Sequence, residues 1–166
     1  MIEQIYEKKR IGFARNHARN LLERFKSAKV PKIEYEVPII DIAKYLGFHI
    51  ENLNSMADHH SAIIYPDNML IGLNKNHHEH RQRFSLGHEL GHYLLKHPPE
   101  FELPLEEIKI CNREADEFSG ELLVPLESLK RSLNHTKSIS DLTHLFNVSQ
   151  EVITIRLLNQ NLLKKI

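Results

Sequence analysis

The stretch His88-Glu89-Leu90-Gly91-His92 constrains this chain more than any other, because it matches the pattern H-E-x-x-H. On a helix, two histidines four residues apart share one face and lie one turn apart, so both imidazoles can reach the same ion. Glu89 follows the first histidine directly, which places its carboxylate beside the ion, where it can take a proton from the attacking water. The spacing predicts a zinc hydrolase with His88 and His92 as metal ligands and Glu89 as the catalytic residue.

The residues around the motif favour a helix over a chance match, which the 12 histidines of the chain make easier. Apolar residues keep one helical face through the motif, and Pro98-Pro99 end the helix just beyond it. Gly87 and Gly91 lie one turn apart, which lowers helix propensity but lets another helix or a strand approach closely. We therefore expect a closely packed active-site helix.

The length of 166 residues suits one domain, with or without a small appendage. The hydrophobic fraction of 41% and the charged fraction of 27% are ordinary for a globular protein, and no apolar run approaches the length of a membrane span. The first residues show no signal-peptide core, and the single cysteine, Cys111, fits a reducing compartment. We predict a cytoplasmic protein without membrane contact, in which Cys111 packs as a small buried hydrophobe.

Charge is unevenly distributed along the chain. Residues 1–32 hold nine lysines and arginines against three glutamates, a local charge of +6 in a chain of zero formal net charge. Such a segment can meet nucleic acid, an acidic partner or the acidic remainder of its own chain, although a solvated face is the expectation for most charge runs. Apolar residues recur at three- and four-residue spacing here, so residues 1–32 are predicted to form a basic amphipathic N-terminal helix.

A small antiparallel sheet is expected before the motif helix. Residues 37–47 read as a short helix with a proline in its first turn and a glycine at its end. Residues 48–53 alternate as a strand does, and residues 61–65 and 69–73 flank turn residues in the manner of a hairpin. Together with the motif helix and a helix at 108–123, these elements predict an α+β fold.

Two short helices are expected near the end of the chain, over residues 139–146 and 150–159. Their apolar spacing and short turn resemble a helix-turn-helix, in which Thr154, Arg156 and Asn159 would touch DNA if the second helix entered a groove. The segment has few cations, so we favour packing on the core over a DNA contact.

The predicted division of the chain has three parts. They are the basic N-terminal helix at 1–32, a metallopeptidase core at 33–131 and a C-terminal helical segment at 132–166 packed on the core. A catalytic zinc in this core needs a third protein ligand and an open position for water. Residues 112–125 are the segment richest in carboxylates that can pack against the motif helix.

Four blocks of the sequence together resemble the ImmA/IrrE family of metallopeptidases, over residues 37 to about 126. The blocks are residues 37–43, the expected hairpin, residues 83–92 and residues 114–125, of which the last two are specific. The resemblance implies a small gluzincin-like zinc protease of bacteria or their mobile elements, whose known members cut a helix-turn-helix repressor and so release its target genes. It also implies that His88 and His92 are zinc ligands and that Glu89 is the catalytic base.

One position departs from the family pattern. The family has its ligand glutamate three residues before Ala115, where this chain has Asn112, and asparagine is a poor zinc ligand. Asp116 matches a family position suited to hydrogen-bonding a ligand histidine and shares a helical face with Asn112. Our first choice for the third zinc ligand is Glu114, after a local shift, with Asp116 or Glu117 behind it. The alternative is a weakened or inactive site.

The leading hypothesis is a zinc-dependent intracellular endopeptidase that cleaves one regulatory protein, a helix-turn-helix repressor. Tyr93 and His97 lie close enough in sequence to be tested as further groups of the site. One alternative is a catalytically weak or inactive regulator that binds a repressor or DNA through the first helix and the C-terminal helices. Another is a toxin or antitoxin component of a mobile element.

Overall fold

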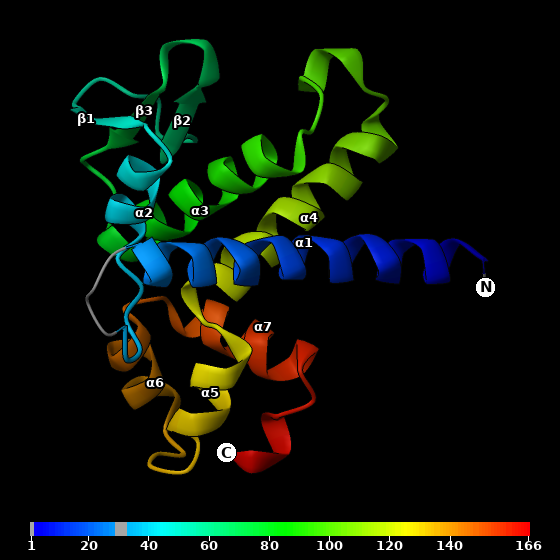
Figure 1. The fold of residues 1–166 in the computed structure, drawn as a ribbon, viewed down its shortest axis with the longest axis vertical. Helices are drawn as coiled ribbons and strands as arrows, with labels where there is room; N and C mark the ends of the chain where they lie inside the picture. The colour runs from blue at the N-terminus through cyan, green and yellow to red at the C-terminus, as the bar shows by residue number, and fades with distance from the viewer. Residues whose placement is uncertain (1, 29–32) are drawn as a thin grey trace.

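The computed structural model describes residues 2–28 and 33–166 (Figure 1). The fold contains both α-helices and β-strands, which confirms the predicted α+β class. Within these residues lie seven α-helices and three strands. They are α1 (Ile2–Ala28), α2 (Ile39–Tyr45), β1 (His49–Leu53), β2 (Ala62–Tyr65), β3 (Leu70–Asn74), α3 (Glu79–Leu95), α4 (Leu105–Leu123), α5 (Leu126–Ser132), α6 (Ile139–Phe146) and α7 (Gln150–Asn159). No helix in this part of the chain is both long and apolar enough to cross a membrane.

The sheet is mixed, which corrects the prediction of an antiparallel sheet. Its strand order is β1-β3-β2. β2 and β3 form the expected antiparallel hairpin, with Ile64 opposite Ile71, but β3 returns between β2 and β1 and pairs in parallel with β1, where Ile50 lies opposite Ile71. Alternation of apolar residues identifies a strand and its buried face, but it does not determine the neighbouring strand or its direction.

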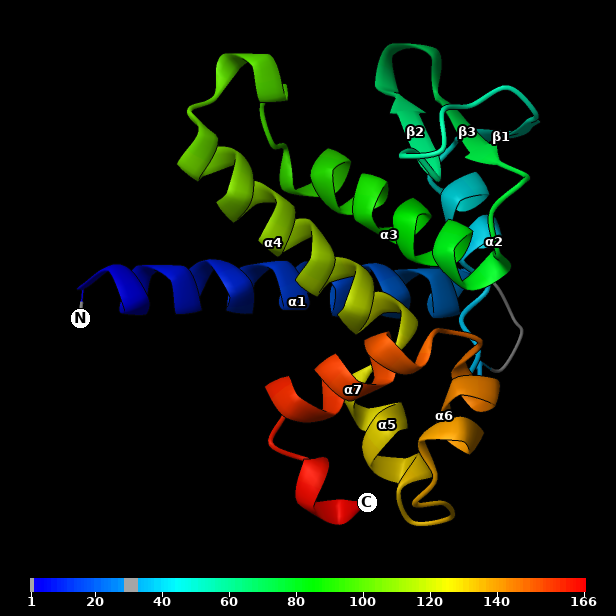
Figure 2. The same cartoon turned by 180° about the vertical axis from the view of Figure 1, so that it is seen from behind.

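Helix α3, which carries the motif, contacts β2 and β3 as well as α4 (Figures 1 and 2). Leu86 and Leu90, one turn apart, are 1% and 0% exposed and belong to the hydrophobic core. The helix begins at the N-cap His78, whose Nδ1 accepts a hydrogen bond from the backbone N–H of His80. It ends at Lys96, which adopts a left-handed conformation with φ of 57°.

Two glycines allow α3 and α4 to approach closely, as expected. A Cβ atom at Gly91 would lie 3.1 Å from the Cα of Ala115 and 3.3 Å from its carbonyl oxygen. At Gly87, a Cβ atom would lie 2.3 Å from Oγ of Ser119. Because the contact at Gly91 is with backbone, any side chain there forces the two helices apart.

Helix α1 lies against α4 and is joined to it by a row of ion pairs. The pairs are Arg10 with Glu114 at 2.7 Å, Arg15 with Glu117 at 2.8 Å and Arg19 with Glu121 at 2.9 Å. The basic segment therefore meets the acidic part of its own chain. The expectation of a solvated face is wrong for Arg10 and Arg15, whose side chains are each 19% exposed, whereas the Arg19 side chain is 42% exposed. The part of this segment at 29–32 lies outside the described residues.

The C-terminal helices lie on the other side of α1 from the sheet (Figures 1 and 2). The predicted helices at 139–146 and 150–159 are present as α6 and α7. Arg156 of α7 is 2% exposed, donates to Oε2 of Glu121 at 2.5 Å and also donates to the carbonyl of Val124. Its burial removes Arg156 from the surface that a DNA contact would need. The helix-turn-helix assignment and the division into three parts stay predictions.

Replacing Gly91 with alanine is expected to lower the free energy of unfolding by about 1 kcal/mol or more, because overpacking against Ala115 outweighs the gain in helix propensity. Gly12 is the matched control, since a Cβ atom there would meet nothing within 4 Å on α1. Gly12→Ala should stabilise the protein by up to about 1 kcal/mol. Urea unfolding of both variants measures the difference, and equal stability of the two variants would contradict the close α3–α4 contact.

Candidate metal centre

Two histidines of α3 face two polar side chains of α4 across the glycine contact. Nε2 of His92 lies 2.9 Å from Nε2 of His88 and 3.0 Å from Oδ1 of Asn112. On its far side, His88 donates from Nδ1 to Oδ1 of Asp116 at 2.8 Å. Both pairs are spaced by four residues, so each helix presents one face to the other.

The nitrogen and oxygen atoms of His88, His92 and Asn112 form a site that can bind one cation. His88 donates a hydrogen bond from Nδ1 to Asp116, so the lone pair on its Nε2 can bind an ion. Asn112 donates from Nδ2 to Glu100 at 3.4 Å, which turns its Oδ1 toward the histidines. Nε2 of His88 and Oδ1 of Asn112, each about 3 Å from Nε2 of His92, complete a donor set suited to a divalent transition metal.

The pKa values of the two histidines are shifted in opposite directions. Burial, followed by the nearby charges of His88 and His97, lowers the pKa of His92 to about 4. Burial also lowers the pKa of His88, but the hydrogen bond and the charge of Asp116 outweigh it and the net shift is upward. His92 is therefore neutral at neutral pH, as a metal ligand must be.

Glu89 is half-buried on α3 beside the histidine pair. Burial raises the pKa of its carboxyl, the charge of His88 opposes this shift, and the charge of Glu100 adds to it. A carboxylate whose pKa is moved toward neutrality suits the role of a base that takes up a proton and returns it.

The structure directs Glu114 away from the histidine pair. Its carboxylate accepts from Nε of Arg10 at 2.8 Å, from Nη2 of Arg10 at 2.7 Å and from Nε2 of His97 at 3.0 Å. Glu114 and Asn112 point about 200° apart on an ideal helix, so only one of them can face α3 at this level. The ligand role of Glu114 stays a prediction that these contacts do not favour, and the α4 side chain that lies against His92 is Asn112, with Oδ1 at 3.0 Å.

A second cluster lies behind the first. His97, Cys111 and Glu114 bring a nitrogen, a sulfur and an oxygen within 4.8 Å of one another. The Arg10 guanidinium already supplies a cation there, with Nη2 at 2.7 Å from Glu114 and 3.9 Å from Sγ of Cys111. Burial raises the pKa of the Cys111 thiol, which is the opposite of what thiolate ligation needs. We read this cluster as an arginine site and not as a second metal site.

His97 reaches the centre because the chain turns back after α3. The left-handed Lys96 ends the helix, and the backbone N–H of His97 donates to the carbonyl of His92 at 3.1 Å. Its ring then lies with Nδ1 at 3.0 Å from Nδ1 of His92. Its position close to the motif made His97 a residue to test, but it did not predict the contact with His92. Tyr93, the other residue marked in this way, packs edge-to-face on Phe48 with ring centroids 5.0 Å apart.

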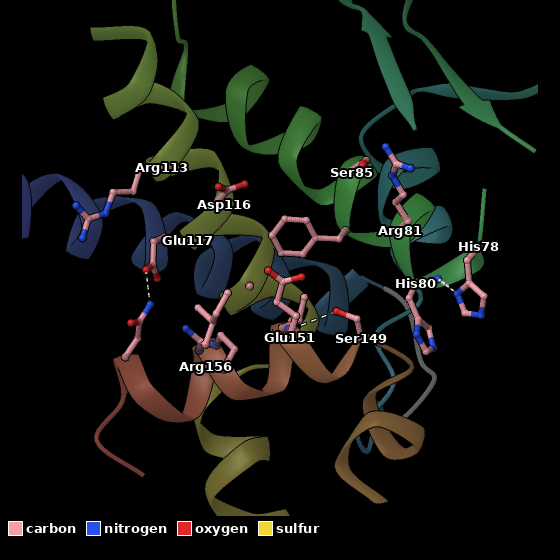
Figure 3. A pocket seen from close by; sticks show the side chains of 15 residues that line it. His78, His80, Arg81, Ser85, Arg113, Asp116, Glu117, Ser149, Glu151 and Arg156 are labelled. Carbon is pink, nitrogen blue, oxygen red and sulfur yellow. Dashed lines mark hydrogen bonds between the residues drawn. The ribbon is translucent and has the colours of Figure 1, made fainter. Parts of the chain in front are cut away.

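A groove of about 770 Å³ adjoins the centre at Asp116 (Figure 3). It lies between α3, α4 and α7. Residues that line it include Arg81, Phe84 and Ser85 of α3, Asp116 and Gly120 of α4, and Val152 and Ile155 of α7. Asp116 thus contacts His88 and also borders the groove, which places the groove beside the candidate metal centre.

A helix with the H-E-x-x-H motif, packed between a small sheet and a second helix with polar groups opposite both histidines, defines a metallopeptidase-fold protein. The sequence model of Peptidase_M78, the IrrE N-terminal-like domain, matches residues 43–158. The chain therefore belongs to this family, which confirms the resemblance seen in the sequence. Helix α1 lies outside the matched residues.

The fold is also similar to a solved structure, a Mycobacterium tuberculosis transcriptional regulator. The TM-score is 0.64 and the sequence identity 15%, over 86% of this chain and 46% of that chain. At this identity the likeness shows the fold alone, and the chain spans less than half of the regulator's length. No curated protein matches the chain.

Replacing Asn112 with aspartate should raise the affinity for Zn²⁺ by about tenfold or more, because it adds a negative charge at the third position without changing its shape. The new aspartate would also repel Glu100 in the metal-free variant. A bound cation relieves this repulsion, which further raises the affinity for Zn²⁺. Asn112→Leu, which removes the oxygen, should weaken binding. Calorimetric titration with a competing chelator gives all three affinities. Equal affinities would place Asn112 outside the donor set.

Proposed function

We propose that this protein is a zinc-dependent endopeptidase that cleaves a specific regulatory protein. The observation that carries the proposal is the approach of His88 and Asn112 to Nε2 of His92, at 2.9 and 3.0 Å, beside Glu89. Membership in Peptidase_M78 supports a peptidase reaction over other hydrolytic chemistry.

In this proposal, Nε2 of His88, Nε2 of His92 and Oδ1 of Asn112 would hold the zinc. Bound zinc polarises the scissile carbonyl and makes water more acidic. Glu89 takes the proton of the attacking water and delivers it to the leaving nitrogen. Asp116 holds the His88 ring through Nδ1, so that the opposite nitrogen faces the ion.

The proposed substrate is a helix-turn-helix repressor in the cytoplasm, as the family resemblance implies. The groove beside Asp116 supports a protein substrate, because it extends the site well beyond one peptide bond. Apolar side chains, including Phe84 and Ile155, line it together with charged ones such as Arg81 and Glu151. We propose that a segment of the repressor lies in this groove while its scissile bond lies at the metal centre.

A second candidate is a regulator of the same fold that binds a repressor without cutting it. Asn112 favours this candidate, since an amide contributes no charge to the donor set where the family has a carboxylate. Metal analysis separates the two functions. A catalytic protein should take up close to one zinc per chain after supplementation, whereas a binding module should stay nearly empty.

Glu89→Gln should keep zinc and lose cleavage by about 100-fold or more, because an amide cannot accept the proton of the attacking water. His88→Ala should lose both zinc and cleavage. Zinc-loaded proteins are incubated with candidate helix-turn-helix repressors, and fragments are followed by mass spectrometry. Cleavage by Glu89→Gln at the wild-type rate would refute the mechanism.

Ile155→Glu should raise KM for the repressor by about tenfold and leave kcat unchanged, because the groove loses an apolar contact on α7, a helix that carries none of the proposed reacting groups. Leu158→Glu is the control on the same helix. Leu158 is 52% exposed and Ile155 is 46% exposed, but only Ile155 lines the groove. Steady-state kinetics of both variants are compared. A similar KM for the two would mean that the substrate does not lie in the groove.

A further inference from the structure

Helix α1 is connected to the metal centre by an unbroken chain of hydrogen bonds. Arg10 donates two hydrogen bonds to the carboxylate of Glu114, at 2.8 and 2.7 Å. Glu114 also lies 3.0 Å from Nε2 of His97, and Nδ1 of His97 lies 3.0 Å from Nδ1 of His92. The chain is shielded from water, since the side chains of His97 and Glu114 are both 6% exposed.

The order of protons along this chain follows from its acidic member. A carboxylate paired with a guanidinium only accepts hydrogen bonds, so His97 must donate to it from Nε2. A second proton on His97 would bury another cation next to Arg10, which already pairs with Glu114 and with the more exposed Glu107, and burying a charge is costly. His97 therefore accepts at Nδ1, and His92 donates to it from Nδ1. This order leaves the lone pair of His92 on Nε2, the atom that faces His88 and Asn112.

We propose that Arg10, Glu114 and His97 are positioning residues that fix the tautomer and the ring orientation of His92 for metal binding. In this arrangement α1 belongs to the metal centre, although it lies outside the residues that match the family. The inference rests on the proposed function only in taking His92 as a zinc ligand. Partners behind a ligand histidine raise its basicity and hold its ring, and their loss costs about 10- to 100-fold in metal affinity.

The ion pairs of α1 provide a matched control. The side chains of Arg10 and Arg15 are each 19% exposed, and both form ion pairs with α4: Arg10 with Glu107 and Glu114, and Arg15 with Glu117. Glu114 also accepts a hydrogen bond from His97, whereas Glu117 accepts one from Asn159 on α7. Loss of either arginine therefore weakens the α1–α4 contact, but only loss of Arg10 breaks the path to His92.

Zinc affinity of the full-length protein tests the inference. Arg10→Gln should bind Zn²⁺ about 10- to 100-fold more weakly than the wild type, and Arg15→Gln should bind as the wild type does. Arg10→Lys, which keeps the charge but not the two-pronged geometry, should recover part of the loss. An equal loss in Arg10→Gln and Arg15→Gln would overturn the positioning role, and so would wild-type affinity in Arg10→Gln.

Imidazole ¹⁵N NMR of the metal-free protein provides a readout that does not depend on zinc or cleavage. Wild-type and Arg15→Gln proteins should show His92 protonated at Nδ1, whereas Arg10→Gln should show a mixture of tautomers. Protonation of His92 at Nε2 in the wild type would overturn the inference. If the wild type binds no zinc, the proposed function fails, and the tautomer of His92 alone then decides whether the hydrogen-bonded chain operates.

Discussion

The contact of Gly91 with the backbone of Ala115 is the constraint on which the rest of this structure depends. It brings α3 and α4 so close that side chains as short as Asn112 and Asp116 reach imidazoles on the other helix. A wider separation would require longer side chains, with more rotamer entropy to lose and less accurate placement. Gly91 lowers the helix propensity of α3, but it allows the donor atoms to be placed accurately. Functional sites often carry a cost of this kind.

Both ends of the motif helix are held by contacts that lie far away in the sequence. At its start, Arg83 is 8% exposed and donates to the carbonyls of Val37 and Asn147, which joins α3 to the segment before α2 and to the turn between α6 and α7. At its end, His97 folds back on His92 and contacts the carboxylate of Glu114 on α4 through Nε2 at 3.0 Å. The helix is thus fixed in register between two hydrogen-bonded anchors, and its histidines keep their height relative to α4.

Local signals predicted more of this protein than long-range ones did. The spacing of His88 and His92, the glycines one turn apart and the helices α6 and α7 depend on neighbours within a few residues, where periodicity is informative. The direction of β1 relative to β3 and the pairing of Arg10 with Glu114 depend on residues far apart in the chain, and nothing local encodes them. Glu114 illustrates the limit. Its residue type suits zinc, but its position about 200° from Asn112 around the helix and its distant arginine decide where it points.

Negative charge lies behind the histidine rings of the centre and not among its donor atoms. Asn112 brings an oxygen but no charge to the donor set, yet two carboxylates lie behind the histidines. Asp116 lies one ring away, behind His88, and Glu114 lies two rings away, behind His97 and His92. Each carboxylate polarises an imidazole and makes its free nitrogen a stronger donor. Arg10 neutralises part of the charge of Glu114, so the two sides are unequal, with His88 polarised more strongly than His92. A metal held by this set would therefore depend on charge transmitted through the histidine rings, which makes the partners of His88 and His92 as important as the donor atoms themselves.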